Sequence, residues 1–226
     1  MVKTGHEQKG RSGVTSVFAH RGASRAEPEN TVAAFLRAKA MGADGVELDV
    51  HRAGLLVHHD AEPVPPDAPT LAEALDACEG MVVNVEIKNL QGDADYDETN
   101  AASDDVVALL HARGGRDEVI VSSFNLATIN RVRELDPSIA TAFLVMHAPD
   151  DDVIGRIIDR TRRHGHGAVN PHHQGITPRL VELAHAAGLT VNTWTVDDPE
   201  RMIYLRDLGV DAIITNVPDL AISTLR

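Results

Sequence analysis

Short runs of alternating apolar and polar residues recur along the chain, and segments of helical periodicity separate them. Residues 44–50 alternate strictly, with three apolar side chains on one face of a predicted strand and Glu47 and Asp49 on the other. Residues 81–88 repeat this pattern and place Glu86 on their polar face. We therefore expect two strands that each combine an apolar outer face with a charged inner face.

The segment between residues 30 and 42 has the spacing of a helix. Asn30 or Thr31 can cap its start, and Gly42 can end it. Apolar residues at i, i+3 and i+4 predict a buried face made of Val32, Phe35, Leu36 and Ala40.

This alternation continues to the end of the chain without a change of composition. The predicted strands cover residues 15–20, 44–50, 81–88, 117–124, 139–145, 167–170, 189–196 and 211–215. The predicted helices between them cover residues 32–41, 71–78, 101–112, 125–136, 151–164, 177–188 and 198–209, with a short one at the end. Regular βα alternation indicates a parallel sheet covered by helices, and eight uninterrupted units favour a closed (β/α)8 barrel. We expect a leader at residues 1–14 and one α/β domain at residues 15–226.

The net charge of the chain limits the classes of binding partner that we expect. Its 226 residues include 21 Lys and Arg against 34 Asp and Glu, a formal net charge of −13. Nucleic acids and anionic membrane surfaces are bound by clustered cations, so neither is expected as a partner. No segment is long and apolar enough to predict membrane insertion. We expect a small-molecule substrate, and the sequence carries no signal for oligomeric state.

A single cysteine, Cys78, excludes an internal disulfide and suits a reducing compartment. It lies in a predicted helix and is expected to be packed rather than reactive. The polar start of the chain lacks the apolar run of a secretory signal, so the expected compartment is the cytoplasm. No glycine-rich nucleotide motif follows any predicted strand.

Three carboxylates are expected to converge inside the barrel: Glu47, Asp49 and Glu86. Buried together without a counter-charge they would repel one another and lose hydration. A hard divalent cation with oxygen ligands, Mg²⁺ or Ca²⁺, removes that conflict. The alternative is neutralisation by nearby cations: Arg21, Arg52 or Lys88.

Two histidines, His20 and His59, fall at strand ends beside these carboxylates. Imidazoles titrate near neutral pH, so the pair fits acid–base hydrolysis of a phosphate ester next to a metal ion. A structural, hydrogen-bonded role is the alternative for each. His58 adjoins His59 but alternates to the opposite side of the strand, so we assign the chemistry to His59.

Further residues suit substrate binding. Arg21 and Lys88 are natural contacts for a phosphate group, Arg as a planar fork and Lys as a point charge. Trp194 could form an apolar wall against a glycerol or alkyl group, or it could belong to the core. His172 and His173 follow the sixth predicted strand and are expected in an exposed loop.

These motifs together resemble the glycerophosphodiester phosphodiesterase family, metal-dependent hydrolases on a TIM barrel. The matching pieces, in chain order, are H-R-G at 20–22, P-E-N-T at 28–31, G-A-D-G-V-E-L-D-V at 42–50, H-D at 59–60, V-E-I-K at 85–88, S-S-F at 122–124, V-N-T-W-T-V at 191–196 and G-V-D-A-I-I-T at 209–215. The similarity covers nearly the whole chain after the leader.

The resemblance implies hydrolysis of a glycerophosphodiester to glycerol 3-phosphate and an alcohol. It implies that His20 is the general base and His59 the general acid, with one divalent ion on Glu47, Asp49 and Glu86. Arg21 and Lys88 would then contact the phosphate. Two alternatives stay open: a phospholipase-D-like activity on lysophospholipids, and a non-catalytic phosphodiester-binding relative.

The chain departs from the family pattern in three places. The turn between Asp49 and His59 is shortened, and the chain has little or no insertion after the second strand. Asn216 replaces an aspartate that the family usually carries, where we expect a change of hydrogen bonding in a loop with catalysis intact.

Overall fold

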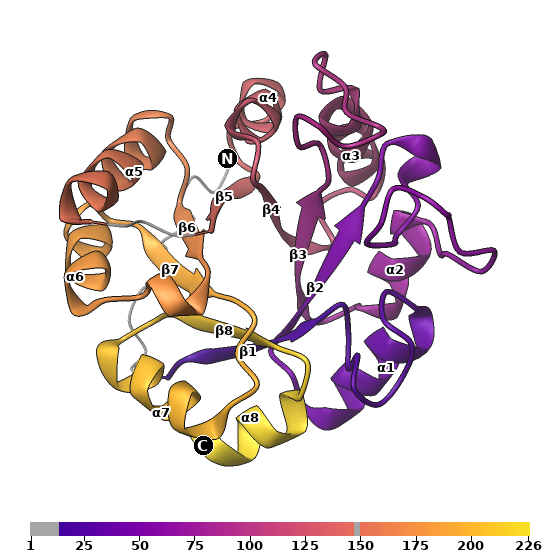
Figure 1. Cartoon of the computed structure of the whole chain (residues 1–226). Helices are drawn as coiled ribbons and strands as arrows, with labels where there is room; N and C mark the ends of the chain where they lie inside the picture. Colours follow the sequence, from indigo (N-terminus) through magenta and orange to yellow (C-terminus); the bar gives the residue numbers. More distant parts are fainter. Residues whose placement is uncertain (1–13, 147–149) are drawn as a thin grey trace, which may run out of the picture.

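A computed structural model describes residues 14–146 and 150–226 of the chain. Over these residues, eight strands pair in parallel, each with the next and the last with the first, to close a barrel (Figure 1). Helices surround the barrel on its outer side. This is the predicted (β/α)8 architecture. The expected leader, residues 1–14, lies outside the described residues except for Val14.

The strands are β1 Ser16–His20, β2 Gly45–Val50, β3 Val82–Ile87, β4 Glu118–Ser123, β5 Ala140–Val145, β6 Ala168–Pro171, β7 Thr190–Thr193 and β8 Ala212–Thr215. The α-helices are α1 Val32–Met41, α2 Leu71–Ala77, α3 Ala101–Ala112, α4 Leu126–Leu135, α5 Asp151–Arg163, α6 Pro178–Ala186, α7 Pro199–Leu208 and α8 Pro218–Leu225. Two short 3-10 turns are η1 Ala53–Leu55 and η2 His173–Gly175. None of these described helices has the length and apolar character needed to cross a membrane.

The strand register places the predicted charged residues next to one another. In the pairing of β1 with β2, His20 lies opposite Glu47. In the pairing of β2 with β3, Asp49 lies opposite Glu86. Because residues two apart on a strand share a face, Glu47, Asp49 and Glu86 all point to the same side of the sheet. The barrel therefore gathers three carboxylates and one imidazole at adjacent positions.

Most of the apolar core lies between the strands and the helices. Residues of β2 and β3 such as Leu48 and Val85 are fully buried there. A smaller cluster, Phe18, Ala212 and Ile214, is separate from this layer. Since Phe18 shares a strand face with His20, this cluster fills the barrel interior on the amino-terminal side of the charged residues.

Helix α1 buries Phe35, as predicted, but turns two alanines inward in place of the other members of the predicted face. Its buried residues are Ala34, Phe35 and Ala38, whereas Val32 is 37% and Leu36 is 50% exposed. The small residues are needed because Gly22 packs against this helix: a Cβ on Gly22 would lie 2.6 Å from the Ala34 carbonyl carbon. The close approach of the loop after β1 thus selects alanine on the buried face.

The cap of α1 is Thr31, whose hydroxyl accepts a hydrogen bond from the Ala34 N–H at 3.2 Å. Asn30, the other candidate cap, is buried at 3% exposure and serves the charged residues of β2 instead.

The shortened turn after β2 forms a tight hairpin. Val50 and Val57 form an isolated antiparallel bridge, and the His51 N–H donates to the Leu56 carbonyl at 3.1 Å. The remainder of the connection to α2 holds no helix or strand beyond η1.

Candidate active site

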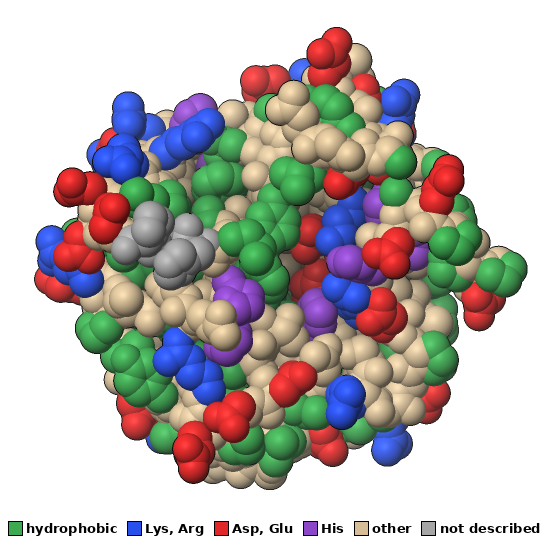
Figure 2. All heavy atoms as spheres, in the orientation of Figure 1, with side chains coloured by type: hydrophobic (Ala, Val, Ile, Leu, Met, Phe, Trp, Pro, Cys, Tyr) green, Lys and Arg blue, Asp and Glu red, His purple; other side chains and the backbone are tan. Residues whose placement is uncertain are grey.

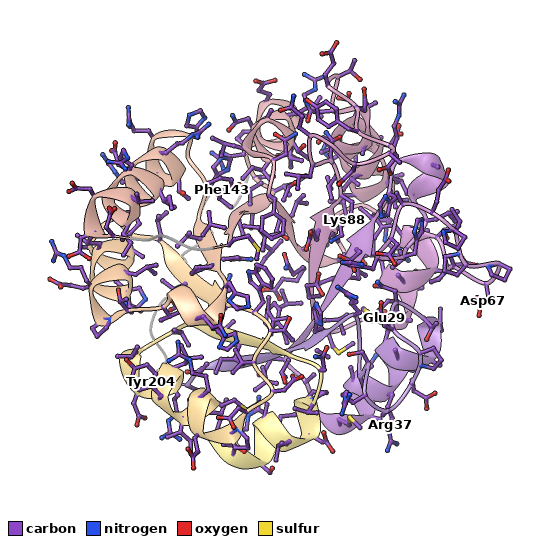
Figure 3. The ribbon with its side chains drawn as sticks, in the orientation of Figure 1. Glu29, Arg37, Asp67, Lys88, Phe143 and Tyr204 are labelled. Carbon is purple, nitrogen blue, oxygen red and sulfur yellow. The ribbon has the colours of Figure 1, made fainter. Side chains whose placement is uncertain are left out.

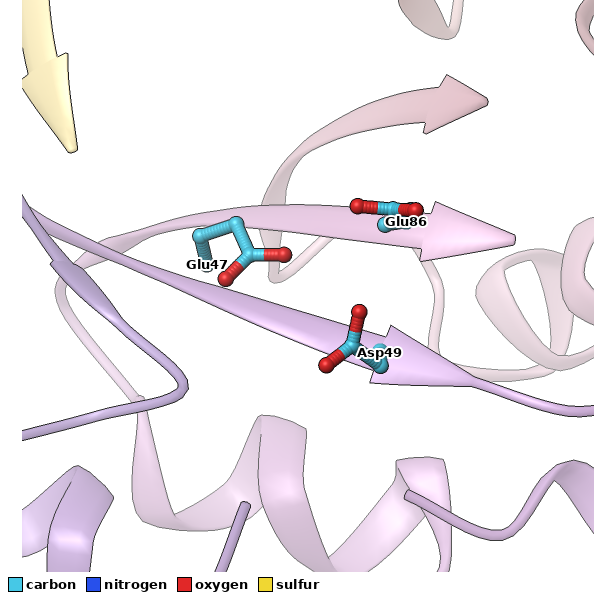
Figure 4. A group of neighbouring side chains, drawn as sticks. All are labelled: Glu47, Asp49 and Glu86. Atoms are coloured by element: carbon cyan, nitrogen blue, oxygen red, sulfur yellow. The ribbon is translucent and has the colours of Figure 1, made fainter. Parts of the chain in front are cut away.

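Three carboxylates from two neighbouring strands share one small volume. Glu47 and Asp49 come from β2 and Glu86 from β3, and Figure 4 shows all three carboxylates on the same side of these strands. One oxygen atom of each lies within 4.8 Å of the others, and all three residues are buried. Among the described residues this is the one group of three or more potential ligands that could hold a metal ion.

Two cations neutralise part of this charge. Lys88 Nζ lies 3.0 Å from Asp49 Oδ1 and 2.9 Å from Glu86 Oε1. Arg21 Nε lies 3.1 Å from Asp49 Oδ2, and its Nη1 donates to Glu29 at 2.8 Å. Figure 3 shows Lys88 and Glu29 on the β2–β3 side of the barrel mouth. The ion pairing considered from the sequence is therefore present, and it converges on Asp49.

The third candidate cation does not take part. Arg52 pairs instead with Asp97, at 3.3 Å, in the loop before α3. Three carboxylates thus face two basic side chains at the centre of the site.

Burial and the neighbouring negative charge raise two of the three carboxyl pKa values. Burial, together with the neighbouring Asp49 carboxylate, raises the pKa of Glu47 to about 8. The same two causes raise the pKa of Glu86 to about 7. Burial also opposes ionisation of Asp49, but Lys88 and Arg21 outweigh it and lower the pKa of that carboxyl. The two glutamates therefore lack a sufficient positive partner.

The loop after β1 is shaped to serve this site. Arg21 and Asn30 both adopt left-handed backbone conformations, with φ of 56° and 57°. The Asn30 N–H donates to the Arg21 carbonyl at 2.9 Å, which ties the two ends of the loop together. The Asn30 side chain then donates to Asp49 Oδ2 at 2.9 Å. This hydrogen bond from Asn30 holds the Asp49 carboxylate in place independently of its ion pairs.

His20 is held by a partner from the opposite end of the chain. Its Nδ1 lies 2.7 Å from Asn216 Oδ1, and its Nε2 lies 3.9 Å from Glu47 Oε2. Asn216 Nδ2 donates to Asp197 at 2.7 Å, which fixes the amide with its oxygen toward His20. Because an amide oxygen only accepts, the proton of neutral His20 is on Nδ1, and the Nε2 lone pair faces the carboxylates.

Burial is the main cause that lowers the pKa of His20 from its ordinary value, and Arg21 adds to it. The hydrogen bond that His20 donates to Asn216 and the nearby carboxylates act in the opposite direction and do not cancel the shift. The imidazole is thus neutral near pH 7, which is the form that can accept a proton.

A cavity of about 300 Å³ opens beside the carboxylates at the carboxyl ends of β2, β3 and β4. Its wall includes His59, Glu86 and Lys88, together with apolar side chains such as Leu90 and Phe124. His59 is half-exposed, and its Nδ1 bonds to Asp60 Oδ1 at 2.7 Å, which leaves Nε2 as the nitrogen that can act on a bound molecule. The shortened turn therefore still brings His59 to the cavity that Glu86 and Lys88 line.

Trp194 lies at the end of β7 and is half-buried. Its indole N–H donates to the Asn170 carbonyl at 2.9 Å, and its ring meets Phe124 edge-on at 5.5 Å. His172 contacts the other side of Trp194, at a ring distance of 5.1 Å. His172 and His173 are half-buried rather than loop-exposed, contrary to expectation. Trp194 also packs on the small apolar cluster inside the barrel, which is the core role considered for it.

The two halves of the barrel mouth differ in character. Figure 2 shows acidic side chains at the bottom of the central hollow, basic and histidine side chains on one side of it, and hydrophobic side chains bordered by further histidines on the other. The charged side is the one over β2 and β3. A ligand in the hollow would meet charge on one side and apolar groups on the other.

The structure brings seven of the eight predicted site residues to this end of β1, β2 and β3, and Trp194 lies across the mouth on the β7 side. The sequence analysis assigned no site role to Asn30, Asn216 or Asp197, which orient Asp49 and His20. A strand-end position was the available signal for Asn216; nothing in the sequence pattern linked it to His20.

The sequence of the chain is similar to those of known proteins. A sequence profile of the glycerophosphoryl diester phosphodiesterase family matches residues 20–62 and 52–220. A glycerophosphodiester phosphodiesterase of Caldanaerobacter subterraneus subsp. tengcongensis is 30% identical over 94% of this chain and 98% of its own length. One of Bacillus altitudinis is 28% identical over 92% of this chain and 97% of its own.

Solved structures show the same barrel. A phosphodiesterase of Oleispira antarctica, in complex with the product sn-glycerol-3-phosphate, superposes with a TM-score of 0.82 at 24% identity, covering 93% of this chain and 96% of that one. A glycerophosphodiester phosphodiesterase of Parabacteroides distasonis gives a TM-score of 0.80 at 24% identity, with coverage of 93% and 96%.

A (β/α)8 barrel with an acidic cluster and histidines at its mouth is typical of hydrolases. This chain belongs to the glycerophosphoryl diester phosphodiesterase family.

Proposed function

We propose that the protein hydrolyses a glycerophosphodiester to glycerol 3-phosphate and an alcohol, with one divalent cation, Mg²⁺ or Ca²⁺, on Glu47, Asp49 and Glu86. The observation that carries the proposal is the three-carboxylate cluster itself. Its oxygens lie within 4.8 Å of one another, and its two glutamates keep raised pKa values although Arg21 and Lys88 are close by. All-oxygen donors at this spacing suit a hard cation.

Charge bookkeeping supports the same assignment. The carboxylates of Glu47, Asp49 and Glu86 and the cations Arg21 and Lys88 leave one negative charge in excess. Glu29, which pairs with Arg21, adds a further carboxylate, so a divalent ion would offset the negative charge of the site before a singly negative phosphodiester binds. When bound, the ion would polarise the phosphoryl group as a Lewis acid.

Arg21 and Lys88 are proposed to hold the phosphate oxygens. Lys88 lines the cavity, and its three N–H donors can turn from a carboxylate to a phosphate oxygen with little movement. Arg21 keeps its charge under all conditions and is fixed by Asp49 and Glu29, so it presents a pre-oriented guanidinium.

His20 is proposed as the general base. Its Nδ1 proton is held by Asn216, and its neutral Nε2 can take the proton of the attacking hydroxyl, from the neighbouring glycerol hydroxyl or from water. His59 is proposed as the general acid. With Asp60 on Nδ1, its Nε2 would deliver a proton to the oxygen of the departing alcohol.

Trp194 and Phe124 are proposed to receive the apolar side of the ligand. The two rings meet edge-on across the mouth from the charged residues, so a glycerol or alkyl group could pack on them while the phosphate faces Lys88. The exposed Leu90 on the cavity wall extends this apolar surface. That surface is the feature that favours the second candidate function, cleavage of lysophospholipids.

The compartment is part of the proposal. Cys78 is buried, and burial raises the pKa of its thiol to about 12, so it is an unreactive packed residue compatible with a reducing cytoplasm.

The test is the release of glycerol 3-phosphate from glycerophosphoethanolamine, with Mg²⁺, with Ca²⁺ and with chelator. We expect turnover that the chelator abolishes and that His20→Ala and His59→Ala each reduce by on the order of 10²-fold or more. His111→Ala is the matched control, because His111 pairs with Asp136 on the outer surface. Full activity in chelator would contradict the metal site, and full activity of His59→Ala would contradict the acid assignment.

The same assay separates the alternatives. Faster cleavage of a lysophospholipid than of glycerophosphoethanolamine would establish the phospholipase-D-like function. Saturable binding of glycerophosphoethanolamine without turnover would establish the non-catalytic relative.

A further inference from the structure

We propose that His51 is a positioning residue for His59: it holds the backbone segment that presents the proton donor to the cavity. The inference rests on the proposed function, since it assumes that His59 acts as the general acid. His51 was assigned no role by the sequence analysis, and it touches neither of the proposed phosphate-binding side chains in the contacts described above.

His51 connects two segments that no strand or helix joins. It directly follows β2 and is 3% exposed. Its Nε2 lies 3.1 Å from the His59 carbonyl oxygen, and its Nδ1 lies 2.6 Å from Asp95 Oδ2 in the loop before α3. The His59 carbonyl and the Asp95 carboxylate are both hydrogen-bond acceptors, so each can take a ring N–H of His51. The imidazole therefore bridges the segment that carries His59 to a neighbouring loop.

A second buried histidine reinforces this arrangement. The ring of His58 stacks on that of His51 with centroids 4.3 Å apart and planes 9° apart. His58 Nδ1 lies 2.6 Å from the Asp60 carbonyl oxygen. Two parallel rings thus hold the carbonyls of two consecutive residues, His59 and Asp60, and the side chain of His59 projects from the backbone between them.

The segment has little else to fix it. His59 is in neither a helix nor a strand, its side chain is 37% exposed, and its partner Asp60 is 80% exposed. The hairpin before it is held by the bridges Val50–Val57 and Leu56–Thr70 and by backbone hydrogen bonds that end at Val57. The exposed ion pair between His59 and Asp60 adds little positional restraint. The hydrogen bond from His51 is therefore the buried side-chain contact that restrains the backbone of His59 itself.

Position matters for a general acid because proton delivery requires hydrogen-bond contact with the leaving oxygen. A displacement of about 1 Å can cost on the order of 10²-fold in rate. The loss appears only when the leaving group needs the proton. An alkoxide leaving group needs it, whereas p-nitrophenolate departs without it. A positioning role for His51 thus predicts a loss that depends on the leaving group.

The experiment compares two diesters of glycerol 3-phosphate, the ethanolamine ester and the p-nitrophenyl ester, in the full chain with its divalent ion. His51→Phe keeps a ring to stack on His58 and removes both hydrogen bonds. We expect kcat to fall by roughly 10- to 100-fold on the ethanolamine ester and by less than about 3-fold on the p-nitrophenyl ester, with KM little changed. His51→Gln, which keeps one side-chain N–H donor, should recover part of the loss.

Asp95→Ala provides a second variant that leaves the barrel core intact, since Asp95 lies in a loop and its side chain is 31% exposed. It removes the acceptor that orients His51 and should show the same selectivity in weaker form. Glu98→Ala is the matched control, an exposed carboxylate in the same loop. The shift of Tm on adding Mg²⁺ is measured for each variant to show that the carboxylate site is intact.

The outcomes separate a failure of the positioning role of His51 from a failure of the proposed function. Selective loss in both His59→Ala and His51→Phe supports the positioning role. The positioning role is overturned if His59→Ala shows the selective loss but His51→Phe and Asp95→Ala lose activity equally on the two esters, or not at all. The proposed function then stands. Equal losses on both esters in His59→Ala, or absence of wild-type turnover, overturn the proposed function and the positioning role with it.

Discussion

The imidazole of His20 and the amide of Asn216 meet at 2.7 Å although 196 positions separate them in the chain. The amide is itself oriented by Asp197, which accepts from its nitrogen at 2.7 Å. The first and last strands of the barrel are neighbours, so this contact forms only when the barrel closes. The protonation state of the proposed base thus depends on a neutral partner backed by a charged one.

Exchanging the two partners should move the pH profile. In the double variant Asp197→Asn/Asn216→Asp, the hydrogen bond between them can form with donor and acceptor reversed, and a carboxylate then faces His20 Nδ1. A negative charge at this distance stabilises the imidazolium and raises the pKa of His20 by about 1 unit or more. Because the base must be neutral to accept a proton, the acidic limb of the profile of kcat/KM against pH should move to higher pH.

The single variant Asp197→Asn is the control for this exchange. It keeps an acceptor for the Asn216 amide and leaves an uncharged oxygen on His20, so the acidic limb should stay where the wild type has it. An unmoved profile in the double variant would contradict the role of His20 as the titrating base.

The raised carboxyl pKa values predict a pH-dependent stability in the absence of metal. The folded-state pKa of Glu47, about 8, lies above its ordinary value of 4.5. Its contribution to stability is therefore fully present below pH 4.5 and is lost as the pH rises through 8. Glu47→Gln removes this loss, so in chelator the variant should have a higher Tm than the wild type at pH 9 and a similar one at pH 5.

Added Mg²⁺ or Ca²⁺ should reverse that order. At pH 8 the wild type should gain Tm through binding, while Glu47→Gln should gain little and lose activity. Glu118→Gln, an exposed glutamate at the start of β4, is the control and should follow the wild type. If Tm in chelator depended on pH in the same way in Glu47→Gln and in the wild type, the raised pKa of the Glu47 carboxyl would be contradicted.

Removal of Lys88 should be costly because its charge is shared by two carboxylates. Lys88→Met keeps the length of the side chain and leaves Asp49 and Glu86 without the contacts at 3.0 and 2.9 Å. We expect kcat/KM for glycerophosphoethanolamine to fall by on the order of 10²–10³-fold, as for loss of a charged group that stabilises a transition state. Lys88→Arg should retain more activity, and Lys39→Met, on the outer side of α1, should retain all of it.

Glycine at position 22 should be indispensable for the loop that carries Arg21. Gly22→Ala introduces a Cβ 2.6 Å from backbone atoms of Ala34 at φ +80°. We expect a loss of more than about 2 kcal/mol in the free energy of unfolding, measured by urea denaturation, together with loss of activity. Gly80→Ala separates the two causes: its φ is +85° with no atom within 4 Å, so it should lose only about 1 kcal/mol.

The sequence pattern was sufficient for the architecture and for the centre of the site. Strict alternation in β2 and β3 predicted that Glu47, Asp49 and Glu86 share one face, because a strand has only two faces. The helical period was only partly right for α1, where Phe35 is buried but Val32 and Leu36 are exposed. There the apolar pattern left the phase of the helix open, and the close approach of Gly22 decided it.

The polar contacts that complete the site could not be read from the chain. The links from Asn30 to Asp49 and from His51 to Asp95 depend on loop conformations that have no periodic signature. The left-handed backbone of Asn30 is one example, since sequence spacing does not reveal it. Such partners become visible only when the loops are placed on the barrel.

The division of the barrel mouth has a consequence for how this scaffold can change. The proposed acid, base and metal ligands come from the first three strands and the connection after β2, with Asn216 closing the ring after β8. The wall from β4 to β7 carries Phe124 and Trp194 and none of the carboxylates. Substitutions along that wall would therefore change the apolar surface offered to a ligand and keep the proposed acid, base and metal ligands in the sequence, which makes the wall a starting surface for directed evolution of a new specificity.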